Sequence, residues 1–215
     1  AVAALAVALL PSALFAAAPA KPAAPAFDSS IISGLGARNI GSAAMSGRIS
    51  SLDAVTMPDG KLMVWVGAAS GGVWKSLDGA TTFTPVFDDQ PVQSIGAVEI
   101  DKRNTDTVWV GTGEAWTRNS VSIGNGIYKT TDGGDTWQHL GLDGSERISD
   151  IRIDPRASDT VYACVTGRLW SDSLERGVYR TRDGGKTWQQ VLKAPNASTG
   201  CASLSMDEEN PDVLY

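Results

Sequence analysis

Two segments of this 215-residue chain combine tryptophan with charged side chains in a way that suits ligand binding. They span residues 113–125 and 167–176, and their candidate binding residues are Glu114, Trp116, Arg118, Asn119, Arg168, Trp170 and Glu175. An indole offers a flat face to a sugar ring or a peptide side chain, and charged neighbours orient the bound group. The alternative is that Trp116 and Trp170 each pack beneath their own segment as a small local core.

Two arginines stand directly before hydrophobic strand patterns, Arg48 before Ile49 and Arg147 before Ile148. A guanidinium at such a strand entrance can bind a carboxylate through two parallel hydrogen bonds. It can equally bridge two neighbouring structural units without touching a ligand. The sequence leaves both interpretations open.

Other residues with catalytic or metal-binding chemistry are scarce. His139 is the single histidine of the chain, and its position fits an exposed strand residue. One histidine cannot build a multi-histidine metal site, and no serine pairs with it as a triad requires. We therefore predict no metal and no cofactor, and no catalytic residue can be named.

A repeat positions these residues. Three segments share a pattern of a basic residue, Asp, Gly, Thr and an aromatic residue, and they span residues 75–83, 129–137 and 180–188. Asp-Gly and Gly-Gly supply the positive φ angles of tight turns, and the Asp carboxylate can accept hydrogen bonds from turn N–H groups. We expect structural roles for these turn residues: Asp78, Asp132, Trp137, Asp183 and Trp188.

The spacing of the repeat predicts the fold. The aspartates of the repeated turns stand 54 residues apart (78 to 132) and 51 residues apart (132 to 183), and a fixed period near ~50 residues is typical of a copied supersecondary unit. Each unit contains four short runs with strand periodicity, as in a propeller blade. We predict an all-β, partial β-propeller over residues 34–215, with four-stranded blades at about 48–87, 94–142 and 147–192 and a truncated fourth at 201–215.

This blade pattern places the two tryptophan segments on one face. The repeated turns join the third and fourth strands, so they lie at the same end as the turns between the first and second strands. The segments 113–125 and 167–176 join the second and third strands at the opposite end. Long insertions at one site of a repeat often form its binding face.

The N-terminal residues indicate export. Residues 1–20 are apolar and end in small residues, as in a secretory signal peptide, and residues 21–33 form a Pro/Ala-rich linker. No later segment is apolar for long enough to span a membrane. We expect a secreted, periplasmic or cell-surface location. Three blades and part of a fourth cannot close a ring, and the first residue is not Met, so we expect a fragment.

The net charge bears on the type of partner, and the two cysteines bear on whether the chain contains a disulfide. The net charge is −6 and no basic stripe is visible, which argues against a nucleic-acid partner. Cys164 and Cys201 fall on different units. A disulfide is compatible with export, but the pattern favours two buried apolar thiols.

The turns resemble Asp boxes, also called BNR repeats. Together with Gly34–Gly41, Ala44–Ile49, Ala68–Lys75 and Val110–Glu114, they make the chain similar to exported bacterial proteins of the sortilin N-terminal (VPS10-like) or BNR-repeat glycosyl-hydrolase-like group. The resemblance implies a large propeller within a longer polypeptide. In sortilins the propeller binds peptides and proteins in its channel.

Two groups of enzymes also contain Asp boxes, and their catalytic motifs can be compared with this sequence. Sialidases open their arginine cluster with an Arg-Ile-Pro stretch, whereas this chain has Arg48-Ile49-Ser50. Xyloglucanase-like propellers carry a catalytic Asp before a Gly-Gly of the first blade, where this chain has Ser70. Glycoside hydrolysis requires paired carboxylates, so these departures disfavour that chemistry.

We therefore predict a binding propeller for a peptide, protein or glycan ligand. The alternative is a glycoside hydrolase with carboxylates partly outside the fragment, and a third possibility is a scaffold without a small ligand. The oligomeric state and the ligand cannot be read from the sequence.

Overall fold

The computed structural model describes residues 48–207 and 209–215. These residues form β-strands and one short 3-10 turn at Asp143–Ser145. The expected signal peptide and linker, at residues 1–20 and 21–33, lie outside the described residues. None of the described residues forms a helix that could cross a membrane.

The strands form three four-stranded antiparallel sheets, each following chain order. The first contains β1 (Ile49–Thr56), β2 (Leu62–Ala68), β3 (Gly72–Ser76) and β4 (Thr84–Pro85). The second contains β5 (Ile95–Ile100), β6 (Val108–Thr112), β7 (Ile127–Thr130) and β8 (Gln138–His139). The third contains β9 (Ile148–Asp154), β10 (Ala157–Val165), β11 (Gly177–Thr181) and β12 (Gln189–Lys193). The all-β fold of four-stranded units is confirmed.

A fourth unit begins after the third sheet. Met206 pairs with Leu214 in an antiparallel bridge. Ser205 and Tyr215 exchange two backbone hydrogen bonds of 2.9 and 2.8 Å. These contacts form the first hairpin of a further sheet.

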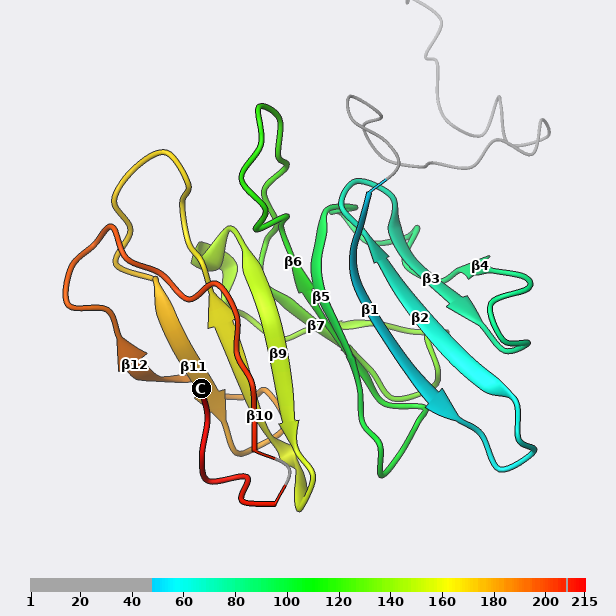
Figure 1. The fold of residues 1–215 in the computed structure, drawn as a ribbon. Helices are drawn as coiled ribbons and strands as arrows, with labels where there is room; N and C mark the ends of the chain where they lie inside the picture. The colour runs from blue at the N-terminus through cyan, green and yellow to red at the C-terminus, as the bar shows by residue number, and fades with distance from the viewer. Residues whose placement is uncertain (1–47, 208) are drawn as a thin grey trace, which may run out of the picture. The chain divides into compact units, whose positions relative to one another are not determined.

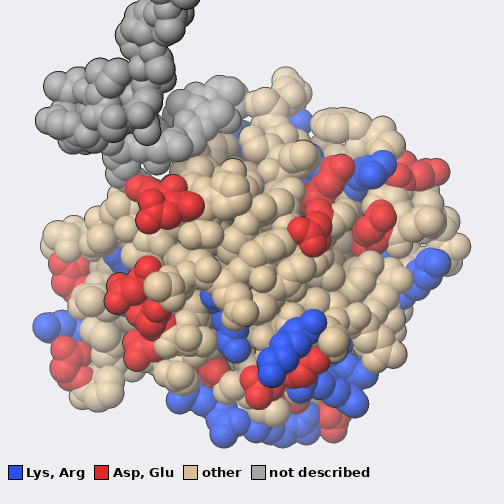
Figure 2. Space-filling view, turned by 180° about the vertical axis from the view of Figure 1, so that it is seen from behind, with Lys and Arg blue, Asp and Glu red and all other residues tan. Residues whose placement is uncertain are grey.

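The first strands of the sheets lie side by side. β1 contacts β5, and β5 contacts β9, while β4 and β12 lie at the outer edges (Figure 1). Short turns join each first strand to its second at the lower end of the view. Lys and Arg side chains gather along this lower edge when the molecule is seen from behind (Figure 2).

The hydrophobic core lies between consecutive sheets. Trp65 and Phe87 of the first sheet region pack with Ile95 and Val98 of β5 in one cluster. Trp109 of β6 packs with β9 in a second cluster, and Val178 packs with Leu204 of the fourth unit in a third. The first strands β5 and β9 therefore bury apolar side chains against the sheet that precedes each of them.

The repeated turns close through their aspartates. Asp132 Oδ1 accepts hydrogen bonds from Thr130 Oγ1 at 2.7 Å and from the Thr136 N–H at 2.9 Å. Asp78 and Asp183 make corresponding bonds in their turns. The hydrogen bonds from Thr136 and Thr130 lower the pKa of Asp132 from 3.8 to about 2, because they favour the charged carboxylate.

The tryptophan that ends each of the second and third turns docks on the preceding sheet. Trp137 Nε1 donates to the carbonyl of Val86 at 2.6 Å, and its ring meets Trp65 edge-on at 6.2 Å. Trp188 Nε1 donates to the carbonyl of Leu140 at 2.8 Å. The repeated turn thus closes a hairpin and also joins neighbouring units.

This docking explains the sequence of the turns. Gly134 has φ 98°, and a Cβ there would lie 3.0 Å from Trp65 of the preceding sheet. The first turn has Ala80 at this position, with φ 67°. No sheet precedes the first one among the described residues, so the side chain of Ala80 meets no such neighbour.

Candidate functional site

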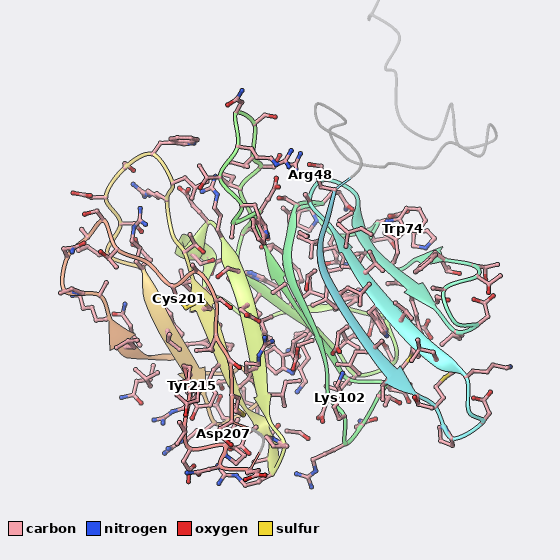
Figure 3. All side chains as sticks on the ribbon, in the orientation of Figure 1. Arg48, Trp74, Lys102, Cys201, Asp207 and Tyr215 are labelled. Atoms are coloured by element: carbon pink, nitrogen blue, oxygen red, sulfur yellow. A yellow bond between two sulfur atoms is a disulfide. The ribbon has the colours of Figure 1, made fainter. Side chains whose placement is uncertain are left out.

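The predicted binding segments both lie at the end of the sheets opposite the repeated turns. The β6–β7 loop (113–126) and the β10–β11 loop (166–176) rise from this end, and Arg48 marks it at the start of β1, while Lys102 lies at the other end (Figure 3). Backbone hydrogen bonds tie the loops to the connections between units, including Gly124 N–H to the Glu146 carbonyl at 2.7 Å and Ser173 N–H to the Ala197 carbonyl at 3.0 Å.

Arg48, Glu114 and Arg147 bridge neighbouring units. The Arg48 guanidinium forms a two-point ion pair with the carboxylate of Glu114, whose side chain is only 1% exposed. Arg147 is also buried; its Nε donates to the Glu114 carbonyl at 3.1 Å and its Nη1 to the Glu146 carboxylate at 2.9 Å. Both arginines donate hydrogen bonds to groups of a neighbouring unit, as the interpretation of a bridge between units predicts.

The remaining candidates divide by exposure. Trp116 and Trp170 are 71% and 72% exposed, so neither packs beneath its loop, and the local-core alternative is wrong. Arg118, Asn119 and Arg168 are exposed as well. Glu175 is half-buried, and the hydrogen bond from Ser173 Oγ at 2.8 Å lowers the pKa of its carboxyl. The structure therefore leaves two free aromatic faces at this end.

A groove of about 630 Å³ runs along the first strands. We call it the first-strand groove, and it is lined by Ser50–Leu52, Val98, Glu99, Ala115–Thr117, Ser149, Asp150, Arg152, Thr166, Ala202 and Ser203. Trp116 stands where the β6–β7 loop borders the groove, and it also lines a smaller adjoining pocket with Arg48 and Arg118. Trp170 is not among the lining residues. The structure thus brings Trp116, but not Trp170, to a concave surface.

The wall of the first-strand groove carries charges that the sequence analysis did not single out. Arg152 Nη1 lies 2.6 Å from Asp150 Oδ1 and 3.4 Å from Glu99 Oε2. Burial, followed by repulsion from the carboxylate of Asp53, raises the pKa of Glu99 from 4.5 to about 7. Near neutral pH this carboxyl therefore exchanges between its protonated and charged forms.

A signal for these residues was present in the strand patterns. Asp53, Glu99 and Arg152 occupy the same position of the repeat, four residues after Ile49, Ile95 and Ile148. A charged residue repeated within a first strand points away from the hydrophobic core, toward the surface that the first strands share. The partners of each charge depend on contacts between units, which no single strand pattern contains.

Among the described residues, no group of three or more His, Cys, Asp or Glu side chains is arranged to hold a metal ion. His139 lies on β8, and its Nε2 is 2.8 Å from the carbonyl oxygen of Asn125. Its ring also stacks obliquely on Tyr128, with 4.8 Å between the ring centroids.

The two cysteines form a disulfide, so the favoured prediction of two free thiols is wrong. Cys164 lies on β10 and Cys201 begins the fourth unit, with 5.2 Å between their Cα atoms. The sequence pattern placed both residues on apolar strand positions but could not show that the two units bring them together. The disulfide holds the segment that contributes Ala202 and Ser203 to the first-strand groove.

Two curated relatives of this chain are named as xyloglucanases. An oligoxyloglucan-reducing end-specific xyloglucanase of Emericella nidulans is 29% identical over 125 residues, which is 51% of this chain and 13% of the relative. A probable enzyme of the same name from Neosartorya fischeri is 35% identical over 81 residues, or 36% of this chain and 9% of the relative. The chain therefore spans only a small part of these proteins.

Solved structures and a family profile extend the comparison. The crystal structure of an ancestral GH74 enzyme aligns with a TM-score of 0.62 and 20% identity, covering 79% of this chain and 22% of that chain. The likeness shows a shared β-propeller fold, so the predicted fold class is confirmed. The profile of the Sortilin-Vps10 family, described as sortilin, neurotensin receptor 3, matches residues 71–215. That match spans more than half of the sequence, and the chain belongs to the Sortilin-Vps10 family.

Proposed function

We propose that this chain forms part of a ligand-binding propeller that holds a peptide or carbohydrate in the first-strand groove. One observation carries the proposal: the ring of Trp116 is 71% exposed beside a 630 Å³ groove. An aromatic platform beside a concave surface with polar groups suits a sugar ring or a peptide side chain.

The ion pair beneath Trp116 supports this role. Glu114 belongs to the same β6–β7 loop as Trp116, two residues before it, and its ion pair with Arg48 ties this loop to the start of the first sheet. A loop anchored in this way loses less conformational entropy when a ligand binds. The groove wall supplies both charge signs through Glu99, Asp150 and Arg152, so it can accept donors and acceptors of a polar ligand.

The test is a glycan-array and peptide-library screen of the full-length protein, repeated with Trp116→Ala. Trp170→Ala is the matched control, because Trp170 is equally exposed but does not line the groove. We expect Trp116→Ala to weaken binding by about 5- to 150-fold, which corresponds to the loss of about 1–3 kcal/mol when an aromatic anchor is truncated, and Trp170→Ala to leave it unchanged. Equal losses in both variants, or none in either, would contradict the proposal.

A glycoside hydrolase is the second candidate function. The specific observation is the carboxyl of Glu99, whose pKa of about 7 would let it act as a general acid near neutral pH. Asp150 lies on the same groove wall, and the curated relatives are named xyloglucanases. Release of reducing ends from xyloglucan oligosaccharides, abolished by Glu99→Gln, would support hydrolysis. Binding without turnover would exclude it for this substrate.

We also propose that the protein is exported from the cytoplasm. The apolar residues 1–20 support a signal peptide that is removed outside the cytoplasm. A disulfide between Cys164 and Cys201 agrees with an oxidising location. Sequencing the N-terminus of the mature protein after cell fractionation tests this, and an intact N-terminus in the cytoplasmic fraction would contradict it.

A further inference from the structure

Arg176 carries a buried charge that has no carboxylate partner among residues 48–207 and 209–215. The buried arginines of the described chain are Arg147 and Arg176. Arg147 pairs with the Glu146 carboxylate at 2.9 Å, whereas Nη2 of Arg176 donates only to backbone carbonyls, those of Arg168 and Ser171. Its Nε has no hydrogen-bond partner within the described residues. A buried guanidinium is costly unless an opposite charge compensates it, so Arg176 has unused capacity for an anion.

A pocket of about 200 Å³ opens beside Arg176. It lies between the β10–β11 loop and the segment after β12, and neither Asp nor Glu lines it. Lys193 is the second basic residue of its wall. The pairing of β11 with β12 sets Lys193 opposite Gly177, the residue after Arg176. The fold thus brings two cations to one small cavity.

The repeat itself does not require a cation at this position. Arg176 precedes the glycine that begins β11, and Asn125 precedes the glycine at the corresponding position before β7. The Asn125 amide donates to the Tyr128 hydroxyl at 2.8 Å and carries no charge. The third strand of a unit can therefore follow a neutral residue, and the repeat does not account for the charge of Arg176.

We propose that this pocket binds a carboxylate with a short apolar stem. The guanidinium of Arg176 and the ammonium of Lys193, both on residues that line the pocket, would receive the anion, and charge-assisted hydrogen bonds of this kind are stronger than neutral ones. Leu174 and Pro195 supply apolar lining for the stem. The pocket shares no lining residue with the first-strand groove, so this proposal stands independently of the proposed function.

Ligand-observed NMR titrations of the full-length protein with butyrate and butyramide test the proposal. The two probes have nearly the same shape and differ in charge. We expect butyrate to bind about tenfold more tightly than butyramide, which corresponds to one charge-assisted hydrogen bond. We also expect added salt to weaken butyrate binding through screening. Equal affinities, or no binding of butyrate, would overturn the proposal.

Three substitutions locate the site. Arg176→Gln should remove the preference for butyrate, and circular dichroism with denaturant unfolding establishes whether the variant protein remains folded. Lys193→Gln changes an exposed side chain, so it decides the matter if Arg176→Gln does not fold, and it should weaken butyrate severalfold. Lys186→Gln is the matched control, since Lys186 is exposed in the repeated turn and lines no part of this pocket. Equal effects of Lys193→Gln and Lys186→Gln would place the anion elsewhere and refute the assignment.

Discussion

The guanidinium of Arg48 and the carboxylate of Glu114 form a two-point ion pair across 66 residues of sequence. Nε of Arg48 donates to Oε1 of Glu114 at 2.7 Å, and the ion pair raises the pKa of Arg48. Arg147 of the third unit donates to the backbone carbonyl of the same glutamate. Glu114 therefore joins three consecutive units at the end of the sheets where the binding loops rise.

Substituting Glu114 by Gln should destabilise the protein strongly. The change keeps the shape of the side chain but leaves the mostly buried guanidinium of Arg48 without its counter-charge, which typically costs about 3–5 kcal/mol. Denaturant unfolding of the full-length protein measures the loss. Asp59→Asn is the control, because it breaks an exposed pair with Lys61 at 3.5 Å and should change stability by less than about 1 kcal/mol. Similar losses in the two variants would show that the buried pair has no special weight.

Trp137 should contribute to the contact between the first and second sheets. Trp137→Phe removes its hydrogen bond to the Val86 carbonyl and part of its packing on Trp65 and Phe87. We expect a loss of about 1–3 kcal/mol in the free energy of unfolding. Trp116→Phe, at an exposed tryptophan, serves as the control and should be nearly neutral. If both changes are neutral, the turn tryptophan does not join the sheets.

Glu99 should make stability fall as the pH rises. Its pKa is about 7 in the folded protein and 4.5 as an ordinary glutamate. Between these values the folded state holds more protons than the unfolded state, so the free energy of unfolding decreases with increasing pH. The carboxyl is 20% exposed, and the decrease should be about 2–3 kcal/mol between pH 5 and pH 8.

Glu99→Gln should remove this component of the pH dependence. Denaturant midpoints measured from pH 5 to pH 8 provide the comparison, with Glu209→Gln as an exposed control of the same chemistry. A slope that is the same in Glu99→Gln and in the unchanged protein would refute the raised pKa.

The disulfide should stabilise the start of the fourth unit and one wall of the first-strand groove. Cys164 and Cys201 close a segment with a sequence separation of 37, and the chain-entropy estimate for such a loop is about 3–4 kcal/mol. The Cys164→Ser/Cys201→Ser double variant should lose stability of that order, as should the reduced protein. Adding reductant to the double variant should have no further effect. An unchanged unfolding curve after complete reduction would contradict this prediction.

Much of the architecture is encoded locally. The Asp-Gly turns at Asp78, Asp132 and Asp183 specify hairpins because glycine accepts positive φ and aspartate accepts nearby N–H bonds. Alternating apolar residues specify strands such as β5 and β9. These signals act over a few residues, so sequence alone determined the four-stranded units, their order and the end at which the long loops emerge.

The contacts between units were decided only by the tertiary structure. Residues distant in sequence form the ion pair of Arg48 with Glu114 and the disulfide of Cys164 with Cys201. The pKa of Glu99 is raised by burial and by the charge of Asp53, which lies on another unit. The exposure of Trp116 and Trp170 was likewise open, because a loop tryptophan can fold inward or outward with the same local pattern. Periodicity fixes which side of its own strand a residue occupies, whereas burial, charge pairing and access to a groove depend on how neighbouring units pack together.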